Sequence, residues 1–140
     1  MIHLIKLAVG IRDVSHLREI QKHRATTNPP LRHQTRNAPR RVADILNGGS
    51  IYWVIKGFLA ARQRIVDIRP DSWDDGTMCC ALVLHPKLVP VVGRAVKPFQ
   101  GWRYLEPSDA PDDVATRRAR AGDDALPEAL LHELRHLCLL

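Results

Sequence analysis

The fold of this chain is decided by the stretch GGSIYWVIKG at residues 48–57, which continues as FLAARQRIVDI at residues 58–68. Residues 50–55 are mostly β-branched and aromatic types, which favour a strand. Two glycines precede this run, and Lys56-Gly57 is typical of a tight turn. Because a second apolar-rich run follows at once, the sequence predicts an antiparallel hairpin.

Side chains alternate between the two faces of a strand, which divides this hairpin into two sides. Trp53 shares one face with two isoleucines, and Tyr52 shares the other with Lys56. In the second arm, Arg62 and Arg64 point to one side. We expect one face to pack as core. The other is either a solvated outer face or a platform that meets a ligand.

Length and composition indicate one domain spanning residues 1–140, large enough for a core. No run of about 18 apolar residues is present, so no transmembrane helix is expected. The first residues lack the pattern of a signal peptide. The three cysteines have no framework spacing, and Cys79 and Cys80 are expected to be buried in a reduced compartment. These features together predict a cytoplasmic protein without a membrane partner.

The net charge of +6 is unevenly distributed. Residues 1–69 hold 13 Lys and Arg against 4 Asp and Glu, a net charge of +9. Residues 70–140 hold 8 against 11, a net charge of −3. A basic first half suggests a polyanionic partner such as RNA or a nucleotide-like anion. Association of two copies through their opposite halves, or solubility alone, explains the same division.

The most basic segment, residues 31–41, precedes the hairpin. Pro39 is suited to the first turn of a short helix that ends before Gly48. Arg36, Arg40 and Arg41 then cluster near that helix start, where backbone N–H groups favour an anion and arginine matches phosphate geometry. A solvated basic loop is the alternative interpretation.

The rest of the chain supplies further strands and helices. A strand is expected over residues 2–9, a helix from Asp13, a strand over residues 78–85 and an edge strand over residues 89–96. The aromatic segment 98–105 either lines a pocket or closes the core as a packed loop. Residues 106–125 are expected to form a mobile linker, and residues 126–140 a terminal helix.

His132-Glu133-Leu134-Arg135-His136 matches the H-E-x-x-H pattern of zinc proteases. Only four residues follow His136, so the downstream third ligand has no room, and the end of a helix frays. We therefore interpret His132 and His136 as a surface pair and expect neither a metal nor a cofactor. A stoichiometric metal in the purified protein would contradict this interpretation.

Most of the chain resembles an uncharacterised bacterial family, domain of unknown function 1489. The resemblance rests on residues 3–7, 35–36, 39–41, 48–57, 62–65, 80–84 and 98–105. A looser likeness is to PUA-like barrels, including ASCH and EVE domains, in the short helix, the strand entry at Gly49-Ser50, the aromatic strand and the Lys56-Gly57 turn. Ser50 stands where those domains carry an acidic residue. This likeness implies binding of RNA or modified bases, and some ASCH members are amidohydrolases. Of their catalytic set, Thr35 and Lys56 are present, without a partner glutamate.

The expected fold is therefore α+β: a small, mostly antiparallel, PUA-like β-barrel of five or six strands, flanked by two to three helices. We expect a basic pocket between segment 31–41, the Tyr52–Lys56 face and the strand at Gln100–Tyr104. Arg36, Arg40, Arg41 and Lys56 would neutralise phosphate, Trp53 or Trp102 would stack a base, and Gln100 and Arg103 would contact polar base edges. The full predicted site is Arg36, Arg40, Arg41, Tyr52, Trp53, Lys56, Arg62, Gln100, Trp102 and Arg103.

The leading functional hypothesis is a nucleic-acid or modified-nucleotide binding module. The first alternative is a small hydrolase acting on a modified nucleoside or amide. In that case Lys6 or Lys56 would be the nucleophile or base, with a pKa lowered by burial or by Arg62 and Arg64. The second alternative is a protein-interaction domain that forms homodimers.

Overall fold

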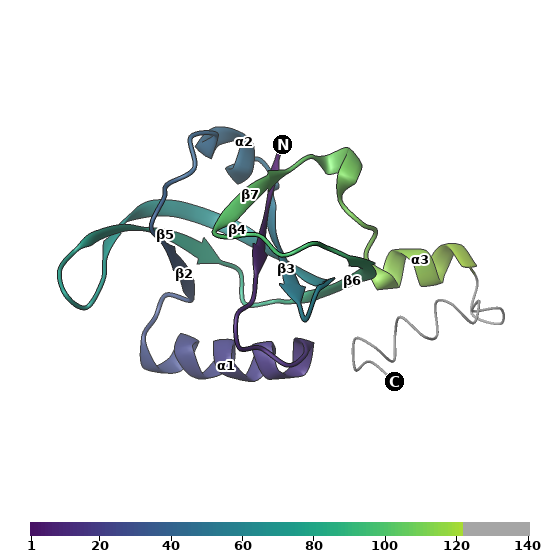
Figure 1. Cartoon of the computed structure of the whole chain (residues 1–140), viewed down its shortest axis with the longest axis horizontal. Helices are drawn as coiled ribbons and strands as arrows, with labels where there is room; N and C mark the ends of the chain where they lie inside the picture. Colours follow the sequence, from purple (N-terminus) through teal and green to yellow (C-terminus); the bar gives the residue numbers. More distant parts are fainter. Residues whose placement is uncertain (122–140) are drawn as a thin grey trace.

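The computed structural model describes residues 1–121, which form seven strands and three α-helices (Figure 1). The strands are β1 (His3–Leu7), β2 (Arg32–Thr35), β3 (Ser50–Ile55), β4 (Phe58–Ser72), β5 (Met78–Leu84), β6 (Val89–Ala95) and β7 (Trp102–Leu105). The helices are α1 (Val14–Thr27), α2 (Val42–Leu46), α3 (Val114–Ala121) and the short 3-10 turn Pro107–Asp109. The α+β class expected from the sequence is confirmed.

The hairpin predicted at residues 50–68 is confirmed as β3 and β4, which pair antiparallel from Ser50 opposite Arg64 to Ile55 opposite Phe58. Lys56 and Gly57 form the turn with φ angles of 49° and 82°. This is the left-handed region that a glycine enters at least cost. Lys56 enters it as a non-glycine residue because a two-residue hairpin loop needs such angles.

The strands follow the order β2-β5-β4-β3-β1-β7, and β6 also pairs with β4. The 15-residue β4 joins two parts of the sheet: its first half pairs with β3 and β6, and its second half with β5. Only β1 and β3 pair in parallel. The sheet is not closed, because β2 and β7 remain the two ends of the hydrogen-bonded path, so the predicted barrel is not confirmed.

Both faces of β3 are buried, so the expectation that the Tyr52 face would point outward is wrong. Trp53 packs in a core cluster with residues of α1, whereas Tyr52 packs in a second cluster with Leu59 and Val91. Tyr52 and Trp53 are each only 4% exposed. A central strand covered on both faces has no free side for a ligand.

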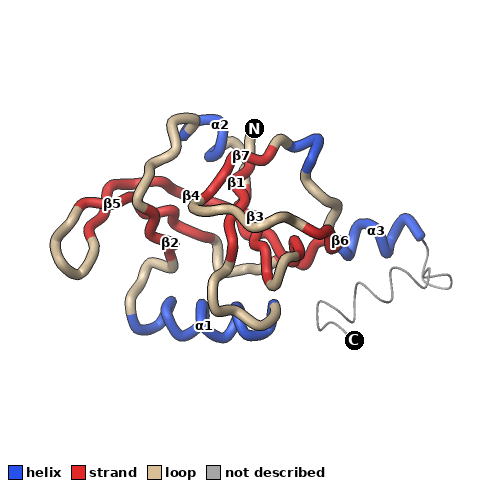
Figure 2. The backbone as a smooth tube through the Cα atoms, in the orientation of Figure 1, coloured by secondary structure: helices blue, strands red, loops and turns tan. Residues whose placement is uncertain are grey.

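The helices lie at different borders of the sheet, with α1 and α2 at opposite ends of the view in Figure 2. The α1 helix is attached by Gln21, which exchanges hydrogen bonds of 2.9 and 2.7 Å with Gln63 of β4. Gly49, between α2 and β3, approaches the backbone carbonyls of Ile2 and Ile45 so closely that a Cβ atom would collide with both. A larger residue there would displace the chain.

Part of the segment expected to be a linker is helical. Residues 107–109 form the 3-10 turn and α3 begins at Val114, which is buried. Asp113, just before α3, makes two hydrogen bonds of 2.7 and 2.8 Å with the guanidinium of Arg62. Residues 122–125 of the expected linker lie outside the described residues, and so does the expected helix 126–140 with His132, His136 and Cys138.

Cys79 and Cys80 are both buried in β5, and neither is in a disulfide. Within residues 1–121, every helix is too short or too polar to span a lipid bilayer.

Candidate functional site

Three adjoining hollows lie along β2, and one of them extends to the other end strand of the sheet, β7. The α1 hollow, about 200 Å³, is lined by residues of α1, β1, β2 and β3, including Lys6, Arg24 and Trp53. The turn hollow, about 500 Å³, includes Arg32 and Trp73. The edge hollow, about 560 Å³, is lined by Lys6, Gln34, Thr35, Arg36, Asn37, Trp73, Gln100, Gly101 and Trp102. Because His33 lines all three, we treat them as one feature and call it the edge groove.

Side chains of β7 hold the two sides of the edge groove together. The Trp102 indole donates a 2.8 Å hydrogen bond to the carbonyl of Asn37, just after β2. The Tyr104 hydroxyl accepts hydrogen bonds from the backbone N–H groups of Arg40, at 2.9 Å, and Arg41, at 3.2 Å. These contacts bridge the ends of the sheet without a strand ladder. Side-chain hydrogen bonds, and not strand pairing, therefore link the segment after β2 to β7.

His33, at the centre of the groove, is poised as a neutral imidazole. Its ring meets the Trp53 ring edge-on, with centroids 5.3 Å apart. Burial, followed by the positive charges of Lys6 and Arg24, lowers its pKa from 6.5 to about 4. Its Nε2 atom is buried and has no hydrogen-bond partner among the described residues. Buried polar atoms usually have a hydrogen-bond partner, so the unpartnered Nε2 of His33 needs an explanation.

Three basic side chains that line the groove have no acidic partner within residues 1–121. Lys6 comes from β1, Arg24 from the last turn of α1, and Arg36 from the residue after β2. None of their side chains is in an ion pair or hydrogen bond in this part of the chain. Burial lowers the pKa of the Lys6 ammonium. Within residues 1–121, no carboxylate neutralises these three charges.

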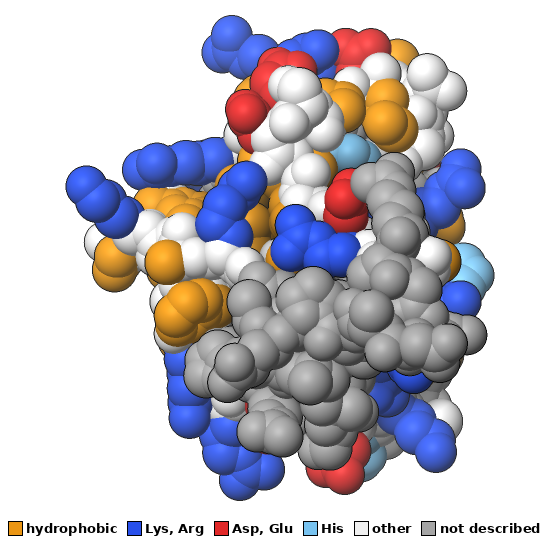
Figure 3. All heavy atoms as spheres, turned by 90° about the vertical axis from the view of Figure 1, so that its right-hand side faces the viewer, with side chains coloured by type: hydrophobic (Ala, Val, Ile, Leu, Met, Phe, Trp, Pro, Cys, Tyr) orange, Lys and Arg blue, Asp and Glu red, His pale blue; other side chains and the backbone are white. Residues whose placement is uncertain are grey.

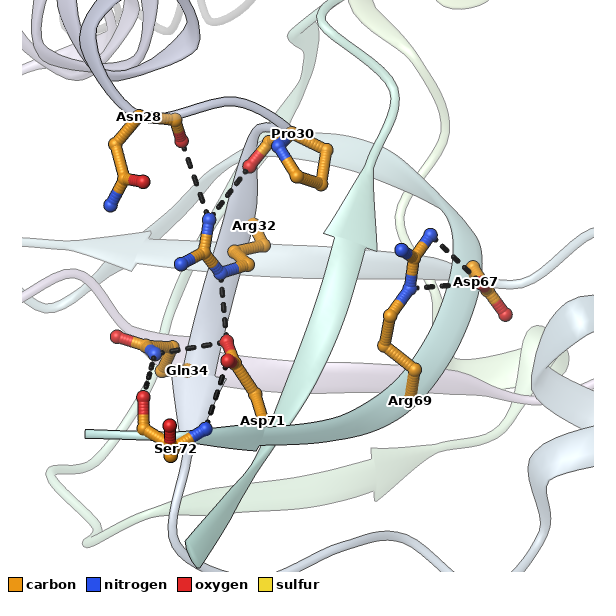
Figure 4. Close-up of polar contacts among 8 residues, drawn as sticks. All are labelled: Asn28, Pro30, Arg32, Gln34, Asp67, Arg69, Asp71 and Ser72. Atoms are coloured by element: carbon orange, nitrogen blue, oxygen red, sulfur yellow. Dashed lines mark hydrogen bonds and ion pairs between the residues drawn. The ribbon is translucent and has the colours of Figure 1, made fainter. Parts of the chain in front are cut away.

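Arg32 differs from those three because its guanidinium is held by the protein (Figure 4). Its Nε donates to Asp71 at 2.8 Å, and its Nη1 donates to the carbonyls of Asn28 and Pro30 at 3.3 and 3.2 Å. Gln34 donates to the same Asp71 carboxylate at 3.0 Å. Hydrogen bonds to the Asp71 carboxylate lower its pKa; they come first from the backbone N–H of Ser72 and then from the side chains of Arg32 and Gln34. The cluster fixes β2 against the end of β4 and leaves the charge of Arg32 neutralised.

Five of the residues predicted from the sequence lie in or beside the edge groove. Arg36, Gln100 and Trp102 line the edge hollow. Trp53 is part of the α1 hollow, but its indole N–H donates to Gln63 and little of its surface is exposed. Arg40 contributes its backbone N–H to Tyr104 at the border. The structure thus brings segment 31–41 and the strand at residues 100–104 together.

The other five predicted residues do not line the groove, and four have other partners. The backbone N–H of Arg41 also donates to Tyr104 at the border, but its guanidinium pairs with Asp44 and Glu106. Tyr52 lies in the second core cluster, with its ring 5.0 Å from that of His3. Arg62 binds Asp113, and the Arg103 guanidinium lies over the Phe99 ring, 4.8 Å from its centroid. Lys56 is exposed at the tip of the β3–β4 hairpin.

Sequence reasoning did not place Arg24, His33, Gln34 or Trp73 in a site. Segment 31–41 as a whole was placed beside the expected pocket, either as an anion-binding helix start or as a solvated basic loop. The strand β2 within it was not predicted, so the alternation of its side chains was not used. Trp73 stands in a polar turn, where an exposed ring is unusual enough to have marked it. Lys6 was named only as a nucleophile for the hydrolase alternative.

Basic charge alone would not have identified the groove. Figure 3 looks onto the side of α3, and Lys and Arg side chains gather around that face as well. The edge groove is distinguished by cations, aromatic rings and amide groups that line one concave surface. No group of three His, Cys, Asp or Glu side chains suited to a metal ion occurs in the described part of the chain.

A family model described as "Protein of unknown function (DUF1489)" matches residues 4–140. Neither a curated protein nor a solved structure matches this chain.

Proposed function

The chain belongs to the DUF1489 family, whose description carries no activity, and we propose that it is a nucleic-acid or nucleotide binding module whose ligand occupies the edge groove. One observation carries this proposal: Lys6, Arg24 and Arg36 have no acidic partner in the described residues, and they share the groove with the Trp73 and Trp102 rings. Cations that follow a backbone and rings that stack bases are the two parts of a single-strand binding surface.

The other groove residues supply the remaining chemistry. Gln100 is exposed in the edge hollow, and the Gln34 amide nitrogen is fixed by Asp71 and Ser72, which leaves its carbonyl oxygen as an acceptor. Amide groups read the edges of unstacked bases, and a base stacked on an aromatic side chain contributes about 1–3 kcal/mol. In this proposal, Arg36 neutralises phosphate, Gln100 contacts a base edge and Trp102 stacks a base.

The PUA-like barrel belongs to this proposal as well. We interpret the sheet as a barrel opened between β2 and β7, and the ligand as the occupant of that opening. The hydrogen bonds from Trp102 to Asn37 and from Arg40 to Tyr104 support this interpretation, since they link the two end strands of the path.

Salt dependence tests the proposed function. Tryptophan fluorescence titrations with a uridine pentaribonucleotide should show tighter binding as salt falls. Three cations that neutralise two or three phosphates of a single strand predict a slope of log K against log salt of about −1.4 to −2, at about 0.7 per phosphate. Arg36→Gln should reduce the size of the slope by about 0.7, whereas Arg94→Gln, at an exposed position of β6 outside the groove, should not. Absence of binding at low salt would refute the proposal.

The hydrolase alternative keeps one supporting observation. Lys6 lines the groove and burial lowers its pKa, as a lysine nucleophile or base requires. Turnover of a modified nucleoside or amide that is lost in Lys6→Ala, with the fold intact by circular dichroism, would favour this activity. Turnover that survives in Lys6→Ala would exclude Lys6 as the catalytic group.

A further inference from the structure

The α1 hollow has no acidic side chain in its lining and contains two cations without a carboxylate partner in the described residues. Lys6 reaches it from β1 and Arg24 from the last turn of α1. The remaining lining consists of Gln21, His33, apolar residues and Arg32, whose charge is neutralised by Asp71. Neither cation is in an ion pair within residues 1–121. Like charges that converge on one hollow repel each other, and an anion placed between them removes that repulsion.

A purely structural explanation accounts for only one of the two cations. Arg24 stands in the last turn of α1, where the helix dipole favours a positive charge. Lys6 has no such reason to be there, since it belongs to a strand and is half-buried. Burial of an ammonium group without a partner is unfavourable, which is also why its pKa is lowered.

His33 supports the same conclusion from a third element. Burial is the main cause of its lowered pKa, and the positive charges of Lys6 and Arg24 lower that pKa further, which places both cations near the ring. Its buried Nε2 has no partner among the described residues. A bound anion would offset the potential of the two cations and make a protonated, hydrogen-bonding imidazole less costly.

We propose that the α1 hollow is a phosphate subsite in which Lys6 and Arg24 bind one phosphodiester group, so that the bases of a single strand extend into the edge hollow. This inference rests on the proposed function. A hollow of about 200 Å³ accommodates one phosphate with part of its sugar, whereas the edge hollow of about 560 Å³ holds the Trp73 and Trp102 rings. This assignment gives the bound strand an orientation: its phosphate backbone lies beside α1 and its bases lie beside β7.

The test separates a phosphate contact from other contributions by the salt slope, because loss of a base contact lowers affinity without changing that slope. Uridine pentaribonucleotide is titrated at several salt concentrations. Because Lys6 and Arg24 share one phosphate, Arg24→Gln and Lys6→Met should each weaken its neutralisation and make the slope less negative, by up to about 0.7. Arg24→Lys, which keeps the charge, should retain it. Arg18→Gln, exposed on α1 and outside the groove, should match the parent protein.

The outcomes distinguish this inference from the proposed function. If the parent protein binds and Arg24→Gln keeps the full slope, the phosphate subsite is refuted and the groove proposal stands. If the parent protein fails to bind at low salt, both are refuted. If circular dichroism shows that Lys6→Met does not fold, the salt slope of Arg24→Gln alone tests the phosphate subsite. Arg24 is suited to this because it is exposed and its side chain has no partner among the described residues.

Discussion

At the scale of the single residue, burial of His33 lowers the free energy of unfolding, and other contacts of the fold must offset this loss. A buried donor or acceptor without a hydrogen bond costs about 1–3 kcal/mol. His33 has such an atom, next to the edge of the Trp53 ring and within reach of the charges of Lys6 and Arg24. A neutral ring is the less expensive form in this environment. Protonation in the folded state is therefore strongly disfavoured.

This cost predicts a pH dependence of stability. The unfolded chain protonates His33 with a pKa near 6.5, and the folded protein only near about 4. As pH falls from 6.5 to 4 the unfolded state binds more protons, so the free energy of unfolding decreases. For His33 this decrease is on the order of 3 kcal/mol.

Urea unfolding at pH 7 and pH 4 of the parent protein and of His33→Gln measures this effect. The variant should lose less stability than the parent, by roughly the stated amount. The lowered pKa of His3 is common to both proteins and cancels in the comparison. Parallel pH profiles of the two proteins would contradict the assignment.

Residue identity predicted some local features and not others. The run 50–55 required a strand, and Lys56-Gly57 required a turn, because both follow from backbone preferences. The sequence marked Gly49 only as a break. Its close approach to Ile2 and Ile45 depends on how α2 and β1 meet. The burial of Tyr52 was missed for the same reason, since β6 and β7 cover its face from distant parts of the chain.

At the scale of the elements, one buried glutamine joins four segments. Gln63 of β4 is completely buried and donates to Gln21 of α1 and to the carbonyl of His85, after β5. Its carbonyl oxygen accepts from Gln21 at 2.9 Å and from the Trp53 indole of β3 at 3.2 Å. A fully bonded polar network of this kind fixes one arrangement of its elements.

Replacement of Gln63 by leucine should therefore be strongly destabilising. It leaves the Gln21 amide and the Trp53 N–H without their buried partner, at a cost of about 2–4 kcal/mol in the free energy of unfolding. Arg64→Leu, at the adjacent exposed position of β4, should change it by about 0.5 kcal/mol or less. Chemical denaturation measures both. Equal stability of the two variants would show that the network contributes little.

The elements that the sequence did not predict are short or polar. β2 consists of Arg-His-Gln-Thr, which has almost no apolar alternation, and it forms a strand because β5 offers an edge for pairing. α3 lies in a segment whose composition indicated a linker. Its start is fixed by burial of Val114 and by the contact of Asp113 with Arg62. Tertiary context decided both elements.

At the scale of the whole molecule, the groove arises from the open path of the sheet. Its two end strands, β2 and β7, are about 70 residues apart in the sequence, and their neighbours in the path are β5 and β1. Local preferences set neither the strand order nor the gap. The expected meeting of segment 31–41 with the strand at residues 100–104 came from the distribution of basic and aromatic residues. The position of β7 in that meeting is set by its pairing with β1, which places Lys6 opposite Trp102.

The hydrogen bonds across this gap should control how easily the end strands separate. Tyr104→Phe removes the oxygen that accepts from the N–H groups of Arg40 and Arg41. Loss of about 1–1.5 kcal/mol of local stability predicts roughly tenfold faster hydrogen exchange at these two amides, while exchange in the central strand β3 stays unchanged. Arg103→Gln, the exposed neighbour on β7, should leave the two amides as in the parent protein.

The same variant links the gap to the proposed ligand. If the edge groove is held at its working width by Tyr104, pentaribonucleotide should bind Tyr104→Phe more weakly, because ordering the two end strands then becomes part of the binding free energy. The salt slope should be unchanged, since no phosphate contact is lost. Faster exchange at Arg40 and Arg41 without a loss of affinity would show that the ligand does not depend on the closure between β2 and β7.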